Sequence, residues 1–233
     1  INTLSNQLSI PIHVHLHETK KEIQDSIKEF GVSPIQRLSE IGLLSPNLIA
    51  VHCVHLSKID LNLLGQEACS VAHCPTSNLK LGSGFPEITQ MLQHGINVGI
   101  GTDSSASNNK LDILSEMKIA SLVAKGLTHE ADSLNAYETI KMATINSAKA
   151  LGLENKIGSI KKGKKADMIA IDSKKIQNHP IYNPISHIVN VFDSDNVSDV
   201  WINGIRVLYD KKFTTIDEDL IRNKVKFWQK KIG

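Results

Sequence analysis

The stretch Ile10-Pro-Ile-His-Val-His-Leu-His17, followed directly by Glu18, decides the fold prediction for this chain. Its even positions carry aliphatic residues, whereas its odd positions carry a proline and then His13, His15 and His17. A period of two is typical of a β-strand with two different faces. We therefore expect a strand over 10–17 that buries its aliphatic face and presents the three histidines together on the other.

Three further apolar runs alternate with helix-like segments. They predict strands over 48–54, 70–74 and 96–101. Apolar residues at helical spacing predict helices over 19–30, 34–41, 59–65, 86–94, 111–125 and 133–151, and residues 1–9 look like the end of an amphipathic helix. Repeated strand–helix units favour a parallel sheet covered by helices, so the expected fold class is α/β.

The last third of the chain has a different character. Segments 158–172 and 198–213 carry turn residues between short apolar runs, which predicts two β-hairpins. Residues 217–232 predict a basic terminal helix. We therefore expect two domains, 1–155 and 156–233, with the boundary near Asn155.

The composition is that of an ordinary soluble protein. The 233 residues are 41% hydrophobic and 21% charged, which argues against a disordered chain. Lys plus Arg is 26 and Asp plus Glu is 24, so the net charge of +2 gives no case for a nucleic-acid partner. Neither a membrane-spanning run nor a signal peptide is evident, and three cysteines suit reduced thiols. We expect a cytoplasmic protein without a membrane partner.

Polar residues follow the predicted strands where a buried sheet would avoid them. His15, His52 and Asp103 each stand at the end of a strand, which is where α/β barrels carry their catalytic residues. Imidazole and carboxylate ligands on separate strands suit a zinc or iron centre, and Glu18 beside His15 suits a proton shuttle. Gly99 and Gly101 are expected to share the face of Asp103 and to leave room there for a metal ion or substrate.

Plainer interpretations exist for several of these residues. A histidine on a strand is more often a satisfied core residue than a ligand, and His13 and His17 could be either such core residues or part of the pocket lining. His55 falls just beyond its strand, so it could be a loop residue. Asp103 could be no more than a helix cap for the residues that follow it.

The segments 13–19, 51–55, 72–82 and 99–109, taken in this order, resemble four motifs of the amidohydrolase superfamily. Shorter matches follow at 111–117, 146–152, 163–167 and 200–204. Within the superfamily, the chain looks most like the 5′-methylthioadenosine/S-adenosylhomocysteine deaminases and their triazine-hydrolase relatives. The resemblance implies strands five to eight of a (β/α)8 barrel, followed by part of a small β-sandwich.

The resemblance also implies a role for each site residue. His15 is expected to bind the metal ion, and Glu18 to act as the acid/base that contacts the substrate ring. His52 is expected beside the attacking water. Asp103 is expected to be both a metal ligand and the proton acceptor for that water. By this resemblance Glu18, His52 and Asp103 are catalytic and also contact the substrate, whereas the role of His73 stays open.

One departure from the family pattern concerns the metal ligands. The family carries a His-x-His pair on its first barrel strand, but here the only such pairs are 13–15 and 15–17, on the fifth. The chain therefore resembles the C-terminal half of such an enzyme. We expect that the N-terminal half was omitted or lost, or that a partner such as a second subunit supplies it.

These observations lead to one functional hypothesis and its alternatives. The hypothesis is a metal-dependent hydrolase that deaminates an adenine nucleoside such as 5′-methylthioadenosine or S-adenosylhomocysteine, releasing ammonia. Its cofactor is expected to be one divalent metal ion, zinc or else iron. The alternatives are a related hydrolase of a triazine, guanine or another heterocycle, and a non-catalytic fragment without a complete metal site.

Overall fold

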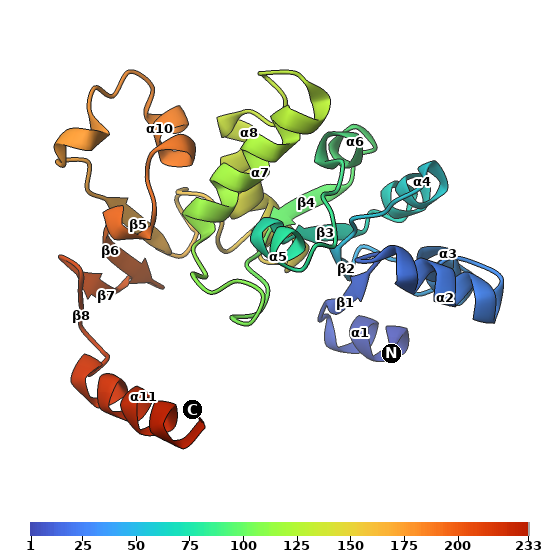
Figure 1. The fold of residues 1–233 in the computed structure, drawn as a ribbon, viewed down its shortest axis with the longest axis horizontal. Helices are drawn as coiled ribbons and strands as arrows, with labels where there is room; N and C mark the ends of the chain where they lie inside the picture. Colours follow the sequence, from blue (N-terminus) through green and yellow to red (C-terminus); the bar gives the residue numbers. More distant parts are fainter. Residues whose placement is uncertain (233) are drawn as a thin grey trace.

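The computed structural model describes residues 1–232, which form two sheets flanked by helices (Figure 1). The first sheet has four parallel strands in the order β1-β2-β3-β4. Their bounds are Ile12–Leu16, Leu48–His52, Ser70–His73 and Asn97–Ile100. Each lies inside a strand expected from the sequence, so the parallel α/β prediction is confirmed for this part of the chain.

Helices connect the strands and cover the sheet. They are α2 (Lys20–Phe30), α3 (Pro34–Glu40), α4 (Lys58–Gln66), α6 (Ile88–Gln93) and α7 (Ile113–Thr128), with α1 (Asn2–Leu8) ahead of β1. The local sequence explains several starts, because Ser33 and Ser57 each form a capping box with the residue three positions later. A further helix, α5 (Pro75–Lys80), begins directly after β3 and was not predicted.

The core lies between the sheet and these helices. Every residue of β2 is buried, which is the pattern of a parallel strand covered on both faces. Leu64 of α4 and Met91 of α6 meet Val71 and Val98 of the sheet in one cluster of buried apolar residues. The three cysteines are also buried, and burial raises the pKa of Cys69 to about 11.

The helix expected over 133–151 is divided into three parts. They are α8 (Ala136–Lys141), a π-helical turn η1 (Met142–Asn146) and α9 (Ser147–Ala150). Ser147 packs directly on β4, because a Cβ atom added to Gly99 would lie 2.7 Å from its Oγ. The expectation that Gly99 leaves room for a metal ion or substrate is therefore wrong, since Ser147 occupies that space.

The second sheet is antiparallel, in the order β5-β6-β7-β8. Its strands are Met168–Ile171, Val197–Ile202, Ile205–Tyr209 and Lys212–Phe213. The hairpin over 198–213 is confirmed, with Asn203 and Gly204 in the left-handed turn between β6 and β7. The prediction of a hairpin over 158–172 is wrong, because β5 pairs with β6 across a long connection.

That connection contains three short helices that the sequence did not predict. They are η2 (Ile176–Asn178), α10 (Pro184–Asn190) and η3 (Ser194–Asn196). Beyond the sheet, α11 (Glu218–Ile232) forms the predicted terminal helix, stands away from both sheets in Figure 1 and buries none of its residues. None of the helices within residues 1–232 is both long and apolar enough to cross a membrane.

Candidate active site

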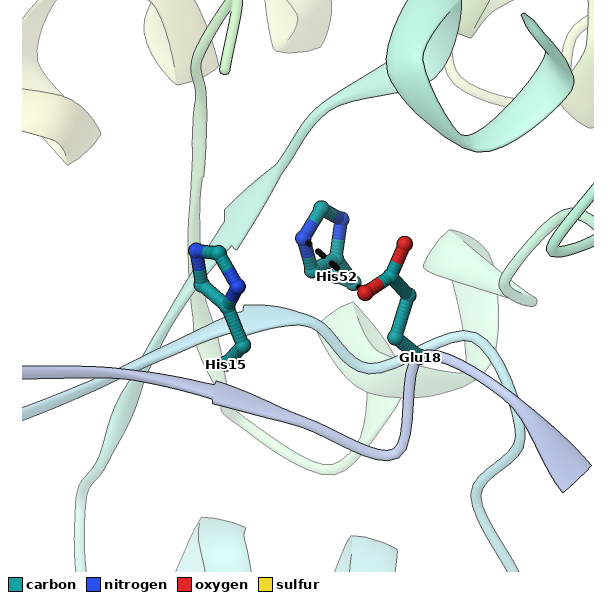
Figure 2. Close-up of side chains that lie close together, drawn as sticks. All are labelled: His15, Glu18 and His52. Carbon is teal, nitrogen blue, oxygen red and sulfur yellow. Dashed lines mark ion pairs between the residues drawn. The ribbon is translucent and has the colours of Figure 1, made fainter. Parts of the chain in front are cut away.

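Three polar side chains meet at the C-terminal ends of β1 and β2 (Figure 2). Parallel pairing sets Leu16 beside His52, so the ends of the two strands lie at one edge of the sheet. The imidazole rings of His15 and His52 meet edge to face, with centroids 4.9 Å apart. Glu18 follows β1 by two residues, and Figure 2 shows its carboxylate turned toward the His52 ring.

His52 faces two carboxylates. Its Nε2 lies 3.8 Å from Oε2 of Glu18 and 4.0 Å from Oδ2 of Asp103. Its Nδ1 donates a hydrogen bond of 2.8 Å to the side-chain oxygen of Asn78, and the ring is only 1% exposed. Because the Nδ1 proton is committed to Asn78, Nε2 is the ring nitrogen that faces both acids. The structure therefore brings Glu18, His52 and Asp103 together, as expected.

His17 does not share the face of His13 and His15. Its backbone has a φ of 51°, in the left-handed region, so the alternation of β1 ends there. The ring is fully buried, donates from Nδ1 to the carbonyl oxygen of His55 at 2.9 Å and accepts from the Ile35 amide at 3.3 Å. The expected row of three histidines on one face is therefore wrong, and the satisfied core interpretation holds for His17.

The turn that contains His17 aims Glu18 at the site. The carboxylate of Glu22 accepts the His17 amide at 2.9 Å and the Glu18 amide at 2.8 Å. Ser83 then donates from its hydroxyl to Oε1 of Glu18 at 3.1 Å. Sequence reasoning missed Glu22, although Thr19 and Glu22 have the spacing of a capping box and point to a carboxylate that serves the start of α2.

Asp103 lies beyond the end of β4, with a left-handed φ of 59°. Its Oδ2 accepts hydrogen bonds from the hydroxyls of Ser77 at 2.5 Å and Ser107 at 2.9 Å. Partial burial pushes the pKa of Asp103 upward, but these hydrogen bonds outweigh burial and the net pKa lies below its usual value. No described helix begins at this point, so the helix-cap alternative is wrong for Asp103.

The remaining histidines differ in their surroundings. His55 is the loop residue of the plainer interpretation, and its Nε2 donates to the carbonyl oxygen of Ser83 at 2.8 Å. His73 is fully buried with its ring edge against Phe85, and neither ring nitrogen has a hydrogen-bond partner within residues 1–232. Burial, followed by the nearby charge of His52, lowers the pKa of His73 to about 3. His73 is therefore neutral in the folded protein near neutral pH.

The site offers suitable donors for a divalent metal ion. His15, Glu18 and His52 each provide one ligand atom, and these atoms lie within 4.8 Å of one another. Two imidazole nitrogens and a carboxylate form a donor set that zinc commonly takes, and Asp103 adds a second carboxylate beside His52. The donor chemistry fits the metal. His15 and Asp103 remain the predicted pair of ligands.

Comparison with known proteins assigns the chain to a family. The profile of the Amidohydrolase family matches residues 2–207, and the chain belongs to this family. A 5-methylthioadenosine/S-adenosylhomocysteine deaminase of Saccharophagus degradans is 45% identical over the whole chain, and the match covers 52% of that protein. The chain thus spans about half the length of the curated relatives it matches.

Solved structures agree with this assignment. An adenosine deaminase from Xanthomonas campestris with bound zinc matches the whole chain with a TM-score of 0.97 and 37% identity, over 53% of its own length. Atrazine chlorohydrolase from Arthrobacter aurescens, complexed with zinc, matches 96% of the chain over 49% of its own length, with a TM-score of 0.89 and 24% identity. The second likeness concerns the fold alone.

Proposed function

We propose that this chain forms part of a metal-dependent deaminase that hydrolyses the amino group of an adenine nucleoside such as 5′-methylthioadenosine or S-adenosylhomocysteine. The observation that carries the proposal is the position of His52 Nε2 between the carboxylates of Glu18 and Asp103, at 3.8 Å and 4.0 Å. The deaminase names of relatives 38–45% identical to this chain support the same reaction.

The proposal includes the architecture around the site. We infer that β1 to β4 are strands five to eight of a (β/α)8 barrel and that 156–233 belong to a separate β-sandwich domain. The parallel order of the four strands supports the first part, since barrel strands follow one another in the same way. The antiparallel sheet of β5 to β8 supports the second.

The residues proposed to hold the metal ion are His15 and Asp103, with His52 beside them. Zinc is favoured over iron because the Xanthomonas campestris neighbour, 37% identical to this chain, contains bound zinc. When bound, the metal ion supplies Lewis-acid chemistry that lowers the pKa of the attacking water.

Asp103 takes the proton from that water. Its lowered pKa keeps the carboxylate ionised at neutral pH, so its Oδ1 can accept a proton without displacing the hydrogen bonds to Oδ2. Ser77 and Ser107 hold Oδ2 in place. The Nε2 lone pair of His52 orients the water, because the Nδ1 proton is engaged by Asn78.

Glu18 acts as the general acid–base catalyst for the substrate ring. As an acid it protonates a ring nitrogen of the purine while the water oxygen adds to C6. The C–N bond to the exocyclic amine then breaks as the amine takes up the proton that Asp103 received from the water, so that it leaves as ammonia. Glu18 regains its proton from the new hydroxyl group on C6. The products are the inosine-type nucleoside and ammonia, so the overall reaction consumes one water molecule.

An ammonia-release assay on the full-length protein tests the proposal. The substrates are 5′-methylthioadenosine, S-adenosylhomocysteine, adenosine, guanine and a triazine, each assayed with zinc or ferrous iron. We expect turnover of the adenine nucleosides with zinc, and loss of that turnover in Glu18→Gln. Turnover of guanine or the triazine alone would replace the nucleoside assignment. Absence of turnover with every substrate would refute the proposed enzymatic function.

A further inference from the structure

Glu116 is a buried carboxylate that the proposed reaction does not use. It lies in the first turn of α7 and is 1% exposed. No lysine, arginine or histidine forms an ion pair with it in the part of the chain that the structure describes. Burying a charge without a cation is costly, so hydrogen bonds must compensate it. The N-terminal end of α7 also favours a negative charge at this position.

The two oxygens of Glu116 bind two different segments. Oε2 accepts the backbone amide of Thr76, in the first turn of α5, at 2.9 Å. Oε1 accepts the side-chain amide of Asn108, in the loop between β4 and α7, at 2.8 Å. One carboxylate therefore ties α5 to that loop, and α7 provides the rigid support.

On the α5 side, Thr76 directly precedes two residues that form hydrogen bonds with Asp103 and His52. Ser77 follows Thr76 and donates to Asp103 at 2.5 Å. Asn78 comes next and accepts the Nδ1 proton of His52 at 2.8 Å. The position of this helix therefore sets the hydrogen bonds of both His52 and Asp103.

On the loop side, Asn108 likewise lies close to residues that contact or precede Asp103. Asn108 follows Ser107, whose hydroxyl donates to Asp103 at 2.9 Å. The same side-chain amide of Asn108 also donates to the carbonyl oxygen of Thr102 at 3.0 Å, directly before Asp103. Glu116 thus acts on Asp103 from both sides. Its partners Thr76 and Asn108 are each adjacent in sequence to a serine, Ser77 or Ser107, that donates to Asp103.

We propose that Glu116 is a positioning residue that sets the geometry of His52 and Asp103 by bridging α5 to the 102–109 loop. This inference rests on the proposed function for its effect on catalysis. Glu116 touches neither His52 nor Asp103 in a hydrogen bond of its own, so it acts only through Thr76 and Asn108.

A carboxylate is required at this position because both neighbours are donors. Glutamine has one acceptor oxygen, so Glu116→Gln would satisfy Thr76 or Asn108 but place an N–H group against the other. Asn108 cannot adapt by turning its amide over, because Thr102 accepts from its nitrogen and the Leu111 amide donates to its oxygen at 3.2 Å. The isosteric variant therefore loosens the bridge without leaving a cavity.

The first measurement uses the metal-free, full-length protein labelled with ¹⁵N-histidine. The Nδ1 proton of His52 should give a slowly exchanging resonance, because it is hydrogen-bonded and buried. In Glu116→Gln we expect this resonance to shift or to exchange faster. A matched control is Asp112→Asn, one turn earlier on the same helix, where a 4% exposed carboxylate caps α7. The control should lose stability but keep the His52 signal, and an unchanged signal in Glu116→Gln would overturn the proposal.

The second measurement is steady-state kinetics of the zinc-loaded enzyme. We expect Glu116→Gln to lower kcat about 100-fold with KM little changed, since displacements near 1 Å typically cost that much. Loss of stability without loss of kcat would show a merely structural role. If Glu116→Gln does not fold, Asn108→Ala removes the loop side of the bridge, and it should lower kcat by more than Asp112→Asn does. Equal kcat in these two variants would overturn the proposal.

The two measurements separate failure of this inference from failure of the proposed function. The His52 resonance needs neither substrate nor metal ion. An inactive wild-type protein in which Glu116→Gln still moves that resonance would refute the deaminase and retain the bridge. An active wild-type protein in which Glu116→Gln changes neither the His52 resonance nor kcat would retain the deaminase and refute the bridge.

Discussion

His17 and Glu18 are consecutive in the chain, yet His17 is fully buried and Glu18 faces the ring of His52. The left-handed backbone of His17 causes this separation, because it turns the chain out of β1 one residue before Glu18. The carboxylate of Glu22 holds both amides of the turn. A non-glycine residue in this region costs of order 1–3 kcal/mol, and such strain is concentrated at functional sites.

This arrangement predicts different outcomes for two nearby histidines. His17→Leu should lower the free energy of unfolding by about 1–3 kcal/mol, because the Ile35 amide and the His55 carbonyl lose their buried partner. Its zinc content should stay that of the wild type. His15→Ala should instead lose zinc with little change in stability. Urea unfolding and metal analysis of both variants check this, and zinc loss in His17→Leu would make His17 a ligand.

Glu18→Gln should keep the metal ion and lose most turnover. Glu18 is proposed to move protons rather than to bind the metal ion, and general acid–base catalysis typically contributes ~10²–10⁴-fold in rate. The measurement is kcat together with zinc content, with the exposed Glu130→Gln as control. Parallel loss of metal and activity would instead make Glu18 a ligand, which its place in the His15–Glu18–His52 group allows.

Asp103→Ala should lose both metal ion and activity, because this one change removes the proposed ligand and the proposed proton acceptor. Its hydrogen-bond donors Ser77 and Ser107 cannot replace a carboxylate. Zinc content and ammonia release are measured beside Asp132→Ala, which removes an exposed carboxylate. Stoichiometric zinc in the Asp103 variant would contradict its assignment as a ligand.

His73 should make the protein less stable in mild acid. Its pKa is about 3 in the folded state and about 6.5 when unfolded, so between these values only the unfolded chain binds the proton. The free energy of unfolding should therefore fall as pH drops below about 6.5, by at most about 1.4 kcal/mol per pH unit from this group.

Urea unfolding between pH 7.5 and 5 measures this dependence (~0.5-unit steps suffice to resolve such a slope). His73→Phe should flatten it, because the titrating group is removed. The exposed His94→Gln should leave it unchanged. An equal slope in wild type and His73→Phe would show that other groups govern acid sensitivity.

Local sequence was sufficient for most of the elements that place the site. The alternation over 10–17 and the apolar runs over 48–54, 70–74 and 96–101 predict the four parallel strands, because side-chain period and burial follow directly from strand geometry. The strand ends also predict that Glu18, His52 and Asp103 meet, since the carboxyl ends of parallel strands share one edge.

Only the tertiary structure decided where the pattern stops and what surrounds it. The left-handed residues His17, His52 and Asp103 break the period of two, and alternation cannot show the residue at which a chain leaves its strand. The space beside Gly99 depends on Ser147, which lies far along the chain. Likewise, Glu116 holds Thr76 from 40 residues away. Such contacts depend on which segments the fold brings together, and no local period in the sequence encodes them.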